Sequence, residues 1–324
     1  MKKILGVGNA LVDILVTLPD DKTLETFGLA KGSMQLVDNS LSSKIINHIS
    51  SYNPVTVSGG SASNTIHGLS KLGMTCSFIG KTSDDEFGNV FKEDLLKNSI
   101  NPMLFKGNLE TGRAVALITP DSERTFATYL GSAVTLSPEE ITPAVFKGHH
   151  YIHVEGYLVQ NHALIEKILK TAKESGLIVS LDLASFNIVT ENLEFLHEIA
   201  KKHVDILFAN ETEALSFTGA DPVESAKIIS GICKVGVVKT GPKGSTICCG
   251  NELCSVDSVE ASPIDTTGAG DLYASGFLYG YMNGLPLKKC AEYGSLLASK
   301  VIERIGAKIP DSDWDKLVEE LQKV

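Results

Sequence analysis

Several features are missing from this sequence of 324 residues, and each absence removes a class of function. The phosphate-binding pattern GxxxxGK[ST] does not occur, which excludes nucleotide binding through that loop. No apolar stretch is long enough to cross a membrane, and the first residues lack the apolar core of a signal peptide. We therefore expect a cytoplasmic protein with no membrane partner.

Basic residues are outnumbered, with 29 Lys and Arg against 39 Asp and Glu, which gives a net charge of −10. A surface of this sign repels nucleic-acid phosphates, so we expect no nucleic-acid partner. The six cysteines show no CxxC spacing, which argues against a zinc site and against a disulfide framework. Cys248, Cys249 and Cys254 lie close together, but the alternating pattern around them is that of a strand with small buried side chains.

Short apolar runs alternate with helical patterns through most of the chain, which predicts an α/β fold. In the second half we expect strands at 151–154, 178–182, 206–209 and 235–239, with helices at 163–175 and 194–201. This order is typical of an open, doubly wound, mostly parallel sheet with helices on both faces. With 43% hydrophobic residues, residues 1–324 can form a single domain.

The pattern changes in the first half of the chain. Two alternating segments, 113–119 and 124–130, flank a Pro-Asp-Ser-Glu turn and predict a β-hairpin. We expect a small β-sheet, built from insertions at about 13–18, 34–37 and 103–130, that stands off the main body. Such a sheet is well placed to act as a lid over a ligand.

The segment Asp265-Thr-Thr-Gly-Ala-Gly-Asp271 comes directly before the apolar pattern of a buried helix. Its small residues 268–270 would leave the first N–H groups of that helix open to an anion. Asp271 then has two interpretations. It caps the first helical turn, or it acts as a general base for a hydroxyl while the N–H groups hold a transferring phosphoryl group.

Polar and small residues gather at the expected carboxyl ends of strands, where open α/β sheets bind their ligands. They are Gly8, Asn9, Gly59, Gly60, Asp182, Asn210, Glu213, Thr240 and Gly241. Asn64 follows one of these glycine turns at the start of a helix and offers both a donor and an acceptor. Asp13 lies within an apolar run, where it is either a satisfied structural carboxylate or a ligand for sugar hydroxyls.

Three motifs occur in a characteristic order: Gly59-Gly-Ser-Ala-Ser-Asn64, Asn210-Glu-Thr-Glu213 and the segment 265–271. In this combination the sequence resembles the ribokinase-like (PfkB) carbohydrate kinases over about residues 3–310. The segment 8–13 is most similar to the bacterial adenosine kinase branch. The resemblance implies ATP-dependent phosphorylation of a primary hydroxyl, that of adenosine in the first place, with ribose, fructose or another nucleoside as the alternative.

The resemblance also implies roles for individual residues. Asp271 would be the general base, and Gly268, Ala269 and Gly270 the anion hole. The substrate hydroxyls would be bound by Asn9, Asp13, Gly59, Gly60 and Asn64. The nucleotide would be bound by Asn210, Lys239, Thr240, Gly241, Gly244 and Thr266.

Charged groups and ions complete these implied roles. Arg124, in the small sheet, could reach the transferred phosphate or could simply lie exposed. Asn210 and Glu213 would hold Mg²⁺ through water. Asp265 and Thr267, with the later loop 302–307, would hold K⁺.

A nucleoside also needs an apolar slot for its flat base. Leu11, Met34, Leu36 and Leu117 in the expected small sheet are candidates, and Tyr157 is a candidate for stacking. Alternation alone is equally consistent with these residues forming the core of the small sheet. The sequence leaves open whether the protein is a monomer or a homodimer, because related small sheets either pair across a dimer or close alone.

Overall fold

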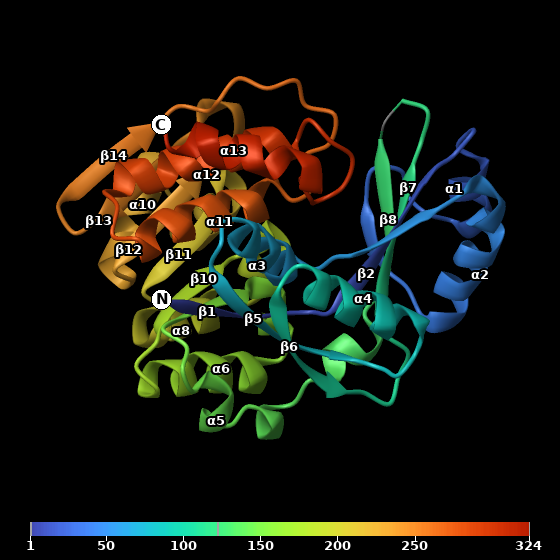
Figure 1. Cartoon of the computed structure of the whole chain (residues 1–324), viewed down its shortest axis with the longest axis horizontal. Coiled ribbons are helices and arrows are strands. Elements are labelled where there is room, and N and C mark those ends of the chain that lie inside the picture. The colour runs from blue at the N-terminus through green and yellow to red at the C-terminus, as the bar shows by residue number, and fades with distance from the viewer. Residues whose placement is uncertain (1, 122, 324) are drawn as a thin grey trace.

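A nine-stranded sheet forms the centre of residues 2–121 and 123–323, the part of the chain that the computed structural model describes (Figure 1). Its strands lie in the spatial order β14 (Glu252–Val256), β13 (Ser245–Cys249), β12 (Val235–Lys239), β11 (Ile206–Asn210), β10 (Ile178–Asp182), β9 (Tyr151–Glu155), β1 (Lys3–Val7), β5 (Thr75–Thr82) and β6 (Ile100–Lys106). The strands from β12 to β6 are parallel, whereas β13 and β14 pair antiparallel at one edge. The predicted mostly parallel sheet is confirmed.

Helices cover both faces of this sheet, so its strands are apolar on both sides. In β11, Ile206 and Phe208 pack into one hydrophobic cluster and Leu207 and Ala209 into the other. One face carries α3 (Ser61–Lys71), α4 (Glu86–Lys97), α11 (Ala269–Met282) and α12 (Leu287–Val301), with α13 (Trp314–Leu321) packed against them. The other face carries α5 (Pro143–Phe146), α6 (His162–Glu174), α7 (Phe186–Glu191), α8 (Leu193–His203), α9 (Glu211–Thr218) and α10 (Pro222–Ile232).

The second sheet stands to one side of the body, as Figure 1 shows. Its strands lie in the order β3 (Met34–Leu36), β8 (Arg124–Tyr129), β7 (Gly112–Ile118), β2 (Leu11–Thr17) and β4 (Val55–Ser58). The helices α1 (Lys22–Phe27) and α2 (Asn39–Ile49) cover one of its faces, where Leu24 and Ile45 pack against Ile14 and Val115. The opposite face is turned toward the carboxyl ends of the large sheet's strands.

Two boundaries of the small sheet differ from those expected. The strand β4 lies outside the ranges expected for the small sheet, but it pairs antiparallel with β2 and belongs to that sheet. The range 103–130 was expected to belong wholly to the lid, but β6 pairs with β5 and extends the large sheet as far as Lys106. Both errors have the same cause, because a strand's own pattern does not identify the strand with which it pairs.

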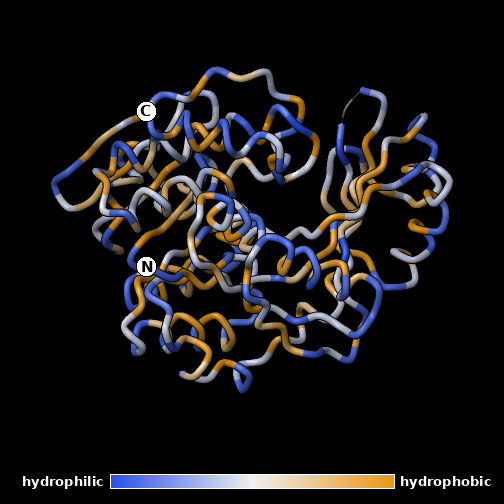
Figure 2. Tube along the Cα trace, in the orientation of Figure 1, coloured by the Kyte–Doolittle hydropathy of each residue, from blue (hydrophilic) through white to orange (hydrophobic). Residues whose placement is uncertain are grey.

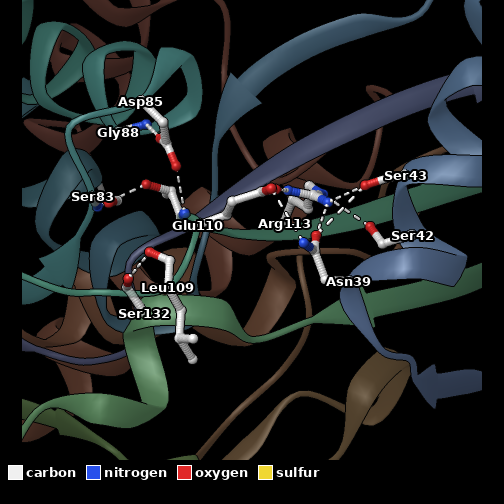
Figure 3. A network of polar contacts seen from close by, with 11 residues as sticks. Asn39, Ser42, Ser43, Ser83, Asp85, Gly88, Leu109, Glu110, Arg113 and Ser132 are labelled. Atoms are coloured by element: carbon white, nitrogen blue, oxygen red, sulfur yellow. Dashed lines mark hydrogen bonds and ion pairs between the residues drawn. The ribbon is translucent and has the colours of Figure 1, made fainter.

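The two sheets are joined at a buried arginine (Figure 3). Arg113, the second residue of β7, is 1% exposed and donates to Ser42 Oγ at 2.9 Å, to Asn39 Oδ1 at 2.6 Å and to Glu110 Oε2 at 2.6 Å. Its guanidinium also lies between the rings of Phe87 and Tyr129, at 5.4 and 5.1 Å. These contacts tie the start of β7 to α2, to α4 and to the loop after β6.

The distribution of hydrophobic residues along the chain agrees with this arrangement of sheets and helices. Figure 2 shows hydrophobic residues along the strands of both sheets and a mixture of hydrophilic and hydrophobic residues along the helices. Among the described residues, no helix combines the length and apolar character that a membrane span requires.

Candidate active site

A cavity of about 1200 Å³ lies between the strand ends of the large sheet and the open face of the small sheet. Most residues predicted for the site line it, namely Asn9, Leu11, Asp13, Met34, Leu36, Gly60, Asn64, Tyr157, Asn210, Glu213, Lys239, Gly241, Gly244, Thr266, Thr267, Ala269, Gly270 and Asp271. The other predicted residues do not line the cavity; they are Gly59, Leu117, Arg124, Thr240, Asp265 and Gly268. The topology therefore brings together segments that are far apart in the sequence.

Asp271 lies in the first turn of α11, with its side chain in the cavity. The helix begins at Ala269, so Gly268 is its N-cap and Gly270 is already helical, whereas the sequence placed both glycines before the helix. The N–H of Ala269 donates to the carbonyl oxygen of Thr266 at 3.2 Å, so it is not open to an anion as predicted. The N–H of Gly270, in the first turn, has no partner within the helix and still fits the predicted anion hole. Gly270 and Asp271 share one edge of the cavity.

The start of α3 holds the Asp271 carboxylate. Ser61 Oγ donates to Asp271 Oδ1 at 2.7 Å, and Asn64 Nδ2 donates to Asp271 Oδ2 at 3.0 Å. The two helices approach closely, because Gly68 on α3 has no side chain and a methyl group there would lie 2.5 Å from Ser275 Oγ. Asn64 therefore contacts Asp271 directly, and Ser61, next to the glycine turn 59–60, was not predicted.

The environment of Asp271 suits a general base. Burial raises the pKa of its carboxyl to about 6, although the hydrogen bonds from Asn64 and Ser61 oppose the rise. A carboxylate with this pKa is ionised at neutral pH and is a better proton acceptor than an exposed aspartate. A simple helix cap would need neither the two side-chain donors nor a place in a cavity.

Glu155 is a site residue that the sequence reasoning missed. It ends β9, is 1% exposed, and its Oε1 accepts from the N–H of Asn9 at 2.9 Å and from Asn9 Nδ2 at 2.6 Å. Its Oε2 accepts from the N–H of Ala62 at 3.1 Å. Burial raises the pKa of Glu155 to about 7, and the three N–H donors favour the ionised form. Glu155 therefore joins the loop after β1 to the start of α3.

Glu155 could have been found from the strand-end rule that identified Asp182. The predicted strand 151–154 stops one residue short of it, and the residue predicted for this region was Tyr157. Tyr157 lies in the turn after β9 and lines the cavity, with its hydroxyl 3.5 Å from the carbonyl oxygen of Ala184.

Asp13 faces the cavity from β2, beside the glycine turn. A methyl group on Gly59 would lie 2.3 Å from the Asp13 carboxyl, and one on Gly60 would lie 2.3 Å from the carbonyl oxygen of Asn9. Only glycines therefore allow β2 and the turn to approach this closely. Burial raises the pKa of Asp13 to about 7, and nearby Lys308 lowers it. Asn9, Asp13, Gly60 and Asn64 together present polar atoms to one end of the cavity.

Lys239 ends β12 and donates to Asp182 Oδ2 at 2.7 Å. Burial would lower the pKa of Lys239, but the carboxylates of Asp182 and Glu213 raise it above its usual value. A methyl group on Gly270 would lie 3.1 Å from Lys239 Nζ, so the ammonium group is next to the first turn of α11. A positive charge and helix N–H groups thus meet at one point, which can bind an anion.

Asn210 and Glu213 form a reciprocal cap at the start of α9. Asn210 Oδ1 accepts from the N–H of Glu213 at 2.8 Å, and Glu213 Oε1 accepts from Asn210 Nδ2 at 2.6 Å. Burial and the neighbouring Asp182 raise the pKa of Glu213 to about 7. The described residues contain no cluster of three or more His, Cys, Asp or Glu side chains able to enclose a metal ion. These oxygen atoms fit Mg²⁺ that keeps its water molecules and is also bound by phosphates.

The turn 240–244 lies at the other end of the cavity. Thr240 donates to the carbonyl oxygen of Gly244 from both its N–H, at 2.8 Å, and its hydroxyl, at 2.9 Å. Thr240 therefore closes the turn, and Gly241 and Gly244 form the surface that a ligand meets.

Asp265 lies under the anion-hole loop and is 5% exposed. Its Oδ1 accepts from the N–H of Thr267 at 2.9 Å, and its Oδ2 accepts from the N–H of Gly306 at 2.6 Å. Arg124 Nη1 lies 2.5 Å from Asp265 Oδ2 and 3.3 Å from Thr267 Oγ1. The structure therefore pairs Arg124 with Asp265, outside the cavity lining, whereas the sequence left open a phosphate contact or an exposed position.

The cavity face of the small sheet is partly as predicted. Leu11, Met34 and Leu36 line the cavity, but Leu117 is fully buried against α1 and α2, and its assignment to the base slot is wrong. Residues of β7 alternate between the two faces, so the cavity side takes Ala114 instead. Phe126, on β8 opposite Met34, also lines the cavity and was missed.

Comparison with known proteins agrees with this geometry. Residues 22–314 match the model of the pfkB family of carbohydrate kinases. The adenosine kinase of Sinorhizobium meliloti superposes with a TM-score of 0.87 and 32% identity, covering 98% of this chain and 99% of that one. A probable sugar kinase from Rhizobium etli has the same TM-score of 0.87 and 32% identity, with coverage of 99% and 98%.

One relative found by sequence is also a kinase. The nucleoside kinase of Methanocaldococcus jannaschii is 31% identical over 277 residues, which are 82% of this chain and 85% of that protein. The chain is therefore a member of the pfkB family of carbohydrate kinases, enzymes that transfer a phosphoryl group to an alcohol.

Proposed function

We propose that this kinase transfers the terminal phosphoryl group of ATP to the 5′-hydroxyl of adenosine, giving AMP and ADP in a purine-salvage reaction. The observation that carries the proposal is the composition of the cavity at its small-sheet end. An apolar wall of Leu11, Met34, Leu36 and Phe126 lies beside the polar group around Asn9, Asp13, Gly60 and Asn64. A nucleoside has the same division into a flat apolar base and a hydroxyl-rich ribose.

The strand register explains why a flat group suits this wall. Ala114 pairs with Asp13 on one side and with Thr128 on the other. A small side chain there leaves room between Asp13, which would bind a ribose hydroxyl, and the larger Leu36 and Phe126. Stacking of a base on such a surface contributes about 1–3 kcal/mol, judged from base–aromatic contacts in nucleic-acid complexes.

The phosphoryl transfer would take place at the start of α11. Asp271 accepts the proton of the 5′-hydroxyl as that oxygen attacks the terminal phosphorus, and the bond to the β-phosphate oxygen breaks. The N–H of Gly270 and the ammonium group of Lys239 stabilise the negative charge on the transferring group. Ser61 and Asn64 keep the carboxylate aimed at the hydroxyl.

ATP would occupy the end of the cavity lined by Gly241, Gly244 and Thr266. Asn210 and Glu213 would hold Mg²⁺ through water, and the ion would neutralise phosphate charge. Because ATP is the donor, we also propose that the enzyme works in the cytoplasm.

A sugar kinase acting on ribose or fructose is the second candidate. Polar side chains also line the cavity, including those of Gln160, Ser185 and Asn187, and they could bind additional hydroxyl groups. The similarity to a probable sugar kinase supports this second candidate as much as the equal similarity to an adenosine kinase supports the first.

The test is the ratio of kcat/KM for adenosine to kcat/KM for ribose and fructose, measured by ADP release. We expect adenosine to exceed both sugars by at least about 10- to 100-fold, the factor that the stacking energy gives. Phe126→Ala should reduce this ratio. The matched control is Val55→Ala, an exposed residue of the same sheet outside the cavity, which should leave the ratio unchanged. Equal or better use of ribose or fructose by the wild type would contradict the adenosine assignment.

A further inference from the structure

Arg124 forms an ion pair that joins the small sheet to Asp265, in the segment directly before α11. It is the first residue of β8, and its side chain is 11% exposed. Asp265, its partner, has a side chain that is 2% exposed. An ion pair this well shielded from water is weakly screened by salt, so it can hold the two parts together.

The Asp265 carboxylate already accepts from three donors. Oδ1 accepts from Thr267 N–H, and Oδ2 accepts from Gly306 N–H and Arg124 Nη1. The same guanidinium nitrogen is 3.3 Å from the Thr267 hydroxyl oxygen. Arg124 thus contacts the side chains of Asp265 and Thr267, the two residues beside whose backbone the family resemblance places a monovalent cation.

A potassium ion at this point would meet an unfavourable charge. It would share Asp265 and Thr267 with a guanidinium group that is always protonated. Two positive charges a few ångströms apart in a buried place repel each other, and one carboxylate neutralises only one of them. The residues as arranged here therefore do not fit K⁺ while Arg124 is in place.

We propose that Arg124 supplies the positive charge at Asp265, so that this kinase needs no monovalent cation. A second consequence is that the loop 265–270 is ordered by the small sheet, because the charge comes from β8. The inference rests on the kinase activity alone and not on which alcohol accepts the phosphoryl group.

The first test compares turnover in potassium, sodium and tetramethylammonium chloride at equal ionic strength. Wild-type rates should agree within about twofold. Arg124→Gln should lower the rate in tetramethylammonium, and potassium should restore it at least about tenfold, because the removed guanidinium leaves room for an ion. The control is Lys31→Gln, which removes a cation bound to Asp21 and Asp121 in the same part of the chain. It should remain insensitive to the salt.

The second test needs no substrate. An ion that binds only the folded state raises the melting temperature. Replacing sodium by potassium should therefore leave the wild-type melting temperature unchanged and raise that of Arg124→Gln. A wild type that is activated or stabilised by potassium overturns the proposal, and so does a folded Arg124→Gln variant that gains no response to potassium. If that variant does not fold, the wild-type comparison still decides.

The two tests also separate this inference from the identity of the acceptor. If adenosine proves to be the wrong substrate, the melting comparison stands, and the salt comparison can be repeated with whichever alcohol is phosphorylated.

Discussion

The hydroxyl group of Ser61 donates a hydrogen bond of 2.7 Å to Oδ1 of Asp271, across 210 positions of sequence. This bond stabilises the ionised carboxylate and opposes the rise in pKa that burial causes. It therefore connects the glycine turn at the start of α3 to the protonation state of the proposed base.

The pH dependence of turnover should report this carboxylate. Asp271 accepts a proton only when it is ionised, and its pKa is raised to about 6, so kcat should fall as the pH is lowered through about 6. Ser61→Ala removes a bond to the ionised form and should move the midpoint to higher pH. Ser70→Ala, at the far end of α3, is the control. An unchanged midpoint in Ser61→Ala would show that another group controls the acid limb.

Glu155 should act as a positioning residue. In Glu155→Gln, one acceptor oxygen becomes an NH₂ group that faces an N–H donor, so the loop at Asn9 and the start of α3 should separate. A lost buried hydrogen bond costs about 1–3 kcal/mol, and we expect kcat/KM for the acceptor to fall by roughly 10- to 100-fold. The KM for ATP should change little. Glu140→Gln, which disturbs a pair with Lys81 outside the cavity, is the control. Equal effects on both substrates would argue for a general loss of structure.

Arg113 should stabilise the fold through its contacts where the two sheets are joined. Arg113→Met leaves Asn39 and Ser42 without their donor, and the free energy of unfolding should fall by roughly 2–3 kcal/mol. Arg113→Lys keeps the charge but loses the planar fork and the contact with Phe87 and Tyr129, so we expect a smaller loss. Urea unfolding at constant m-value measures both. Lys44→Met, an exposed change on α2, should be neutral, and a loss below about 0.5 kcal/mol in Arg113→Met would refute this role.

The sequence predicted best those features that depend on local pattern. The strand–helix alternation located β9 to β12, and the rule that ligands lie at the carboxyl ends of strands correctly predicted that Asp182, Asn210 and Gly241 line one cavity. Hydrogen bonds to Asp271 from a second motif were also foreseeable, because a base needs to be oriented. The sequence instead assigned Asn64 to the substrate hydroxyls, so its hydrogen bond to Asp271 was not among the predictions.

Features that depend on distant pairing were not predictable in the same way. Alternation divides β7 into two faces, but only the packing of α1 and α2 decides that Leu117 lies inside and Ala114 faces the cavity. The pairing of Arg124 with Asp265 depends on how close the small sheet comes to the segment before α11. The membership of β4 in the small sheet depends on its register with β2, which its own four residues do not encode.

The most direct test of the account is the Asp271→Asn variant, studied by turnover and by calorimetry. The amide keeps the size and shape of the carboxylate but cannot take the proton, so turnover should fall by about 10²–10⁴. Calorimetric affinities for adenosine and for ATP should stay within a few-fold of wild type, because neither the apolar wall nor the nucleotide end has changed. Turnover within a few-fold of wild type would contradict the assignment of Asp271 as the base.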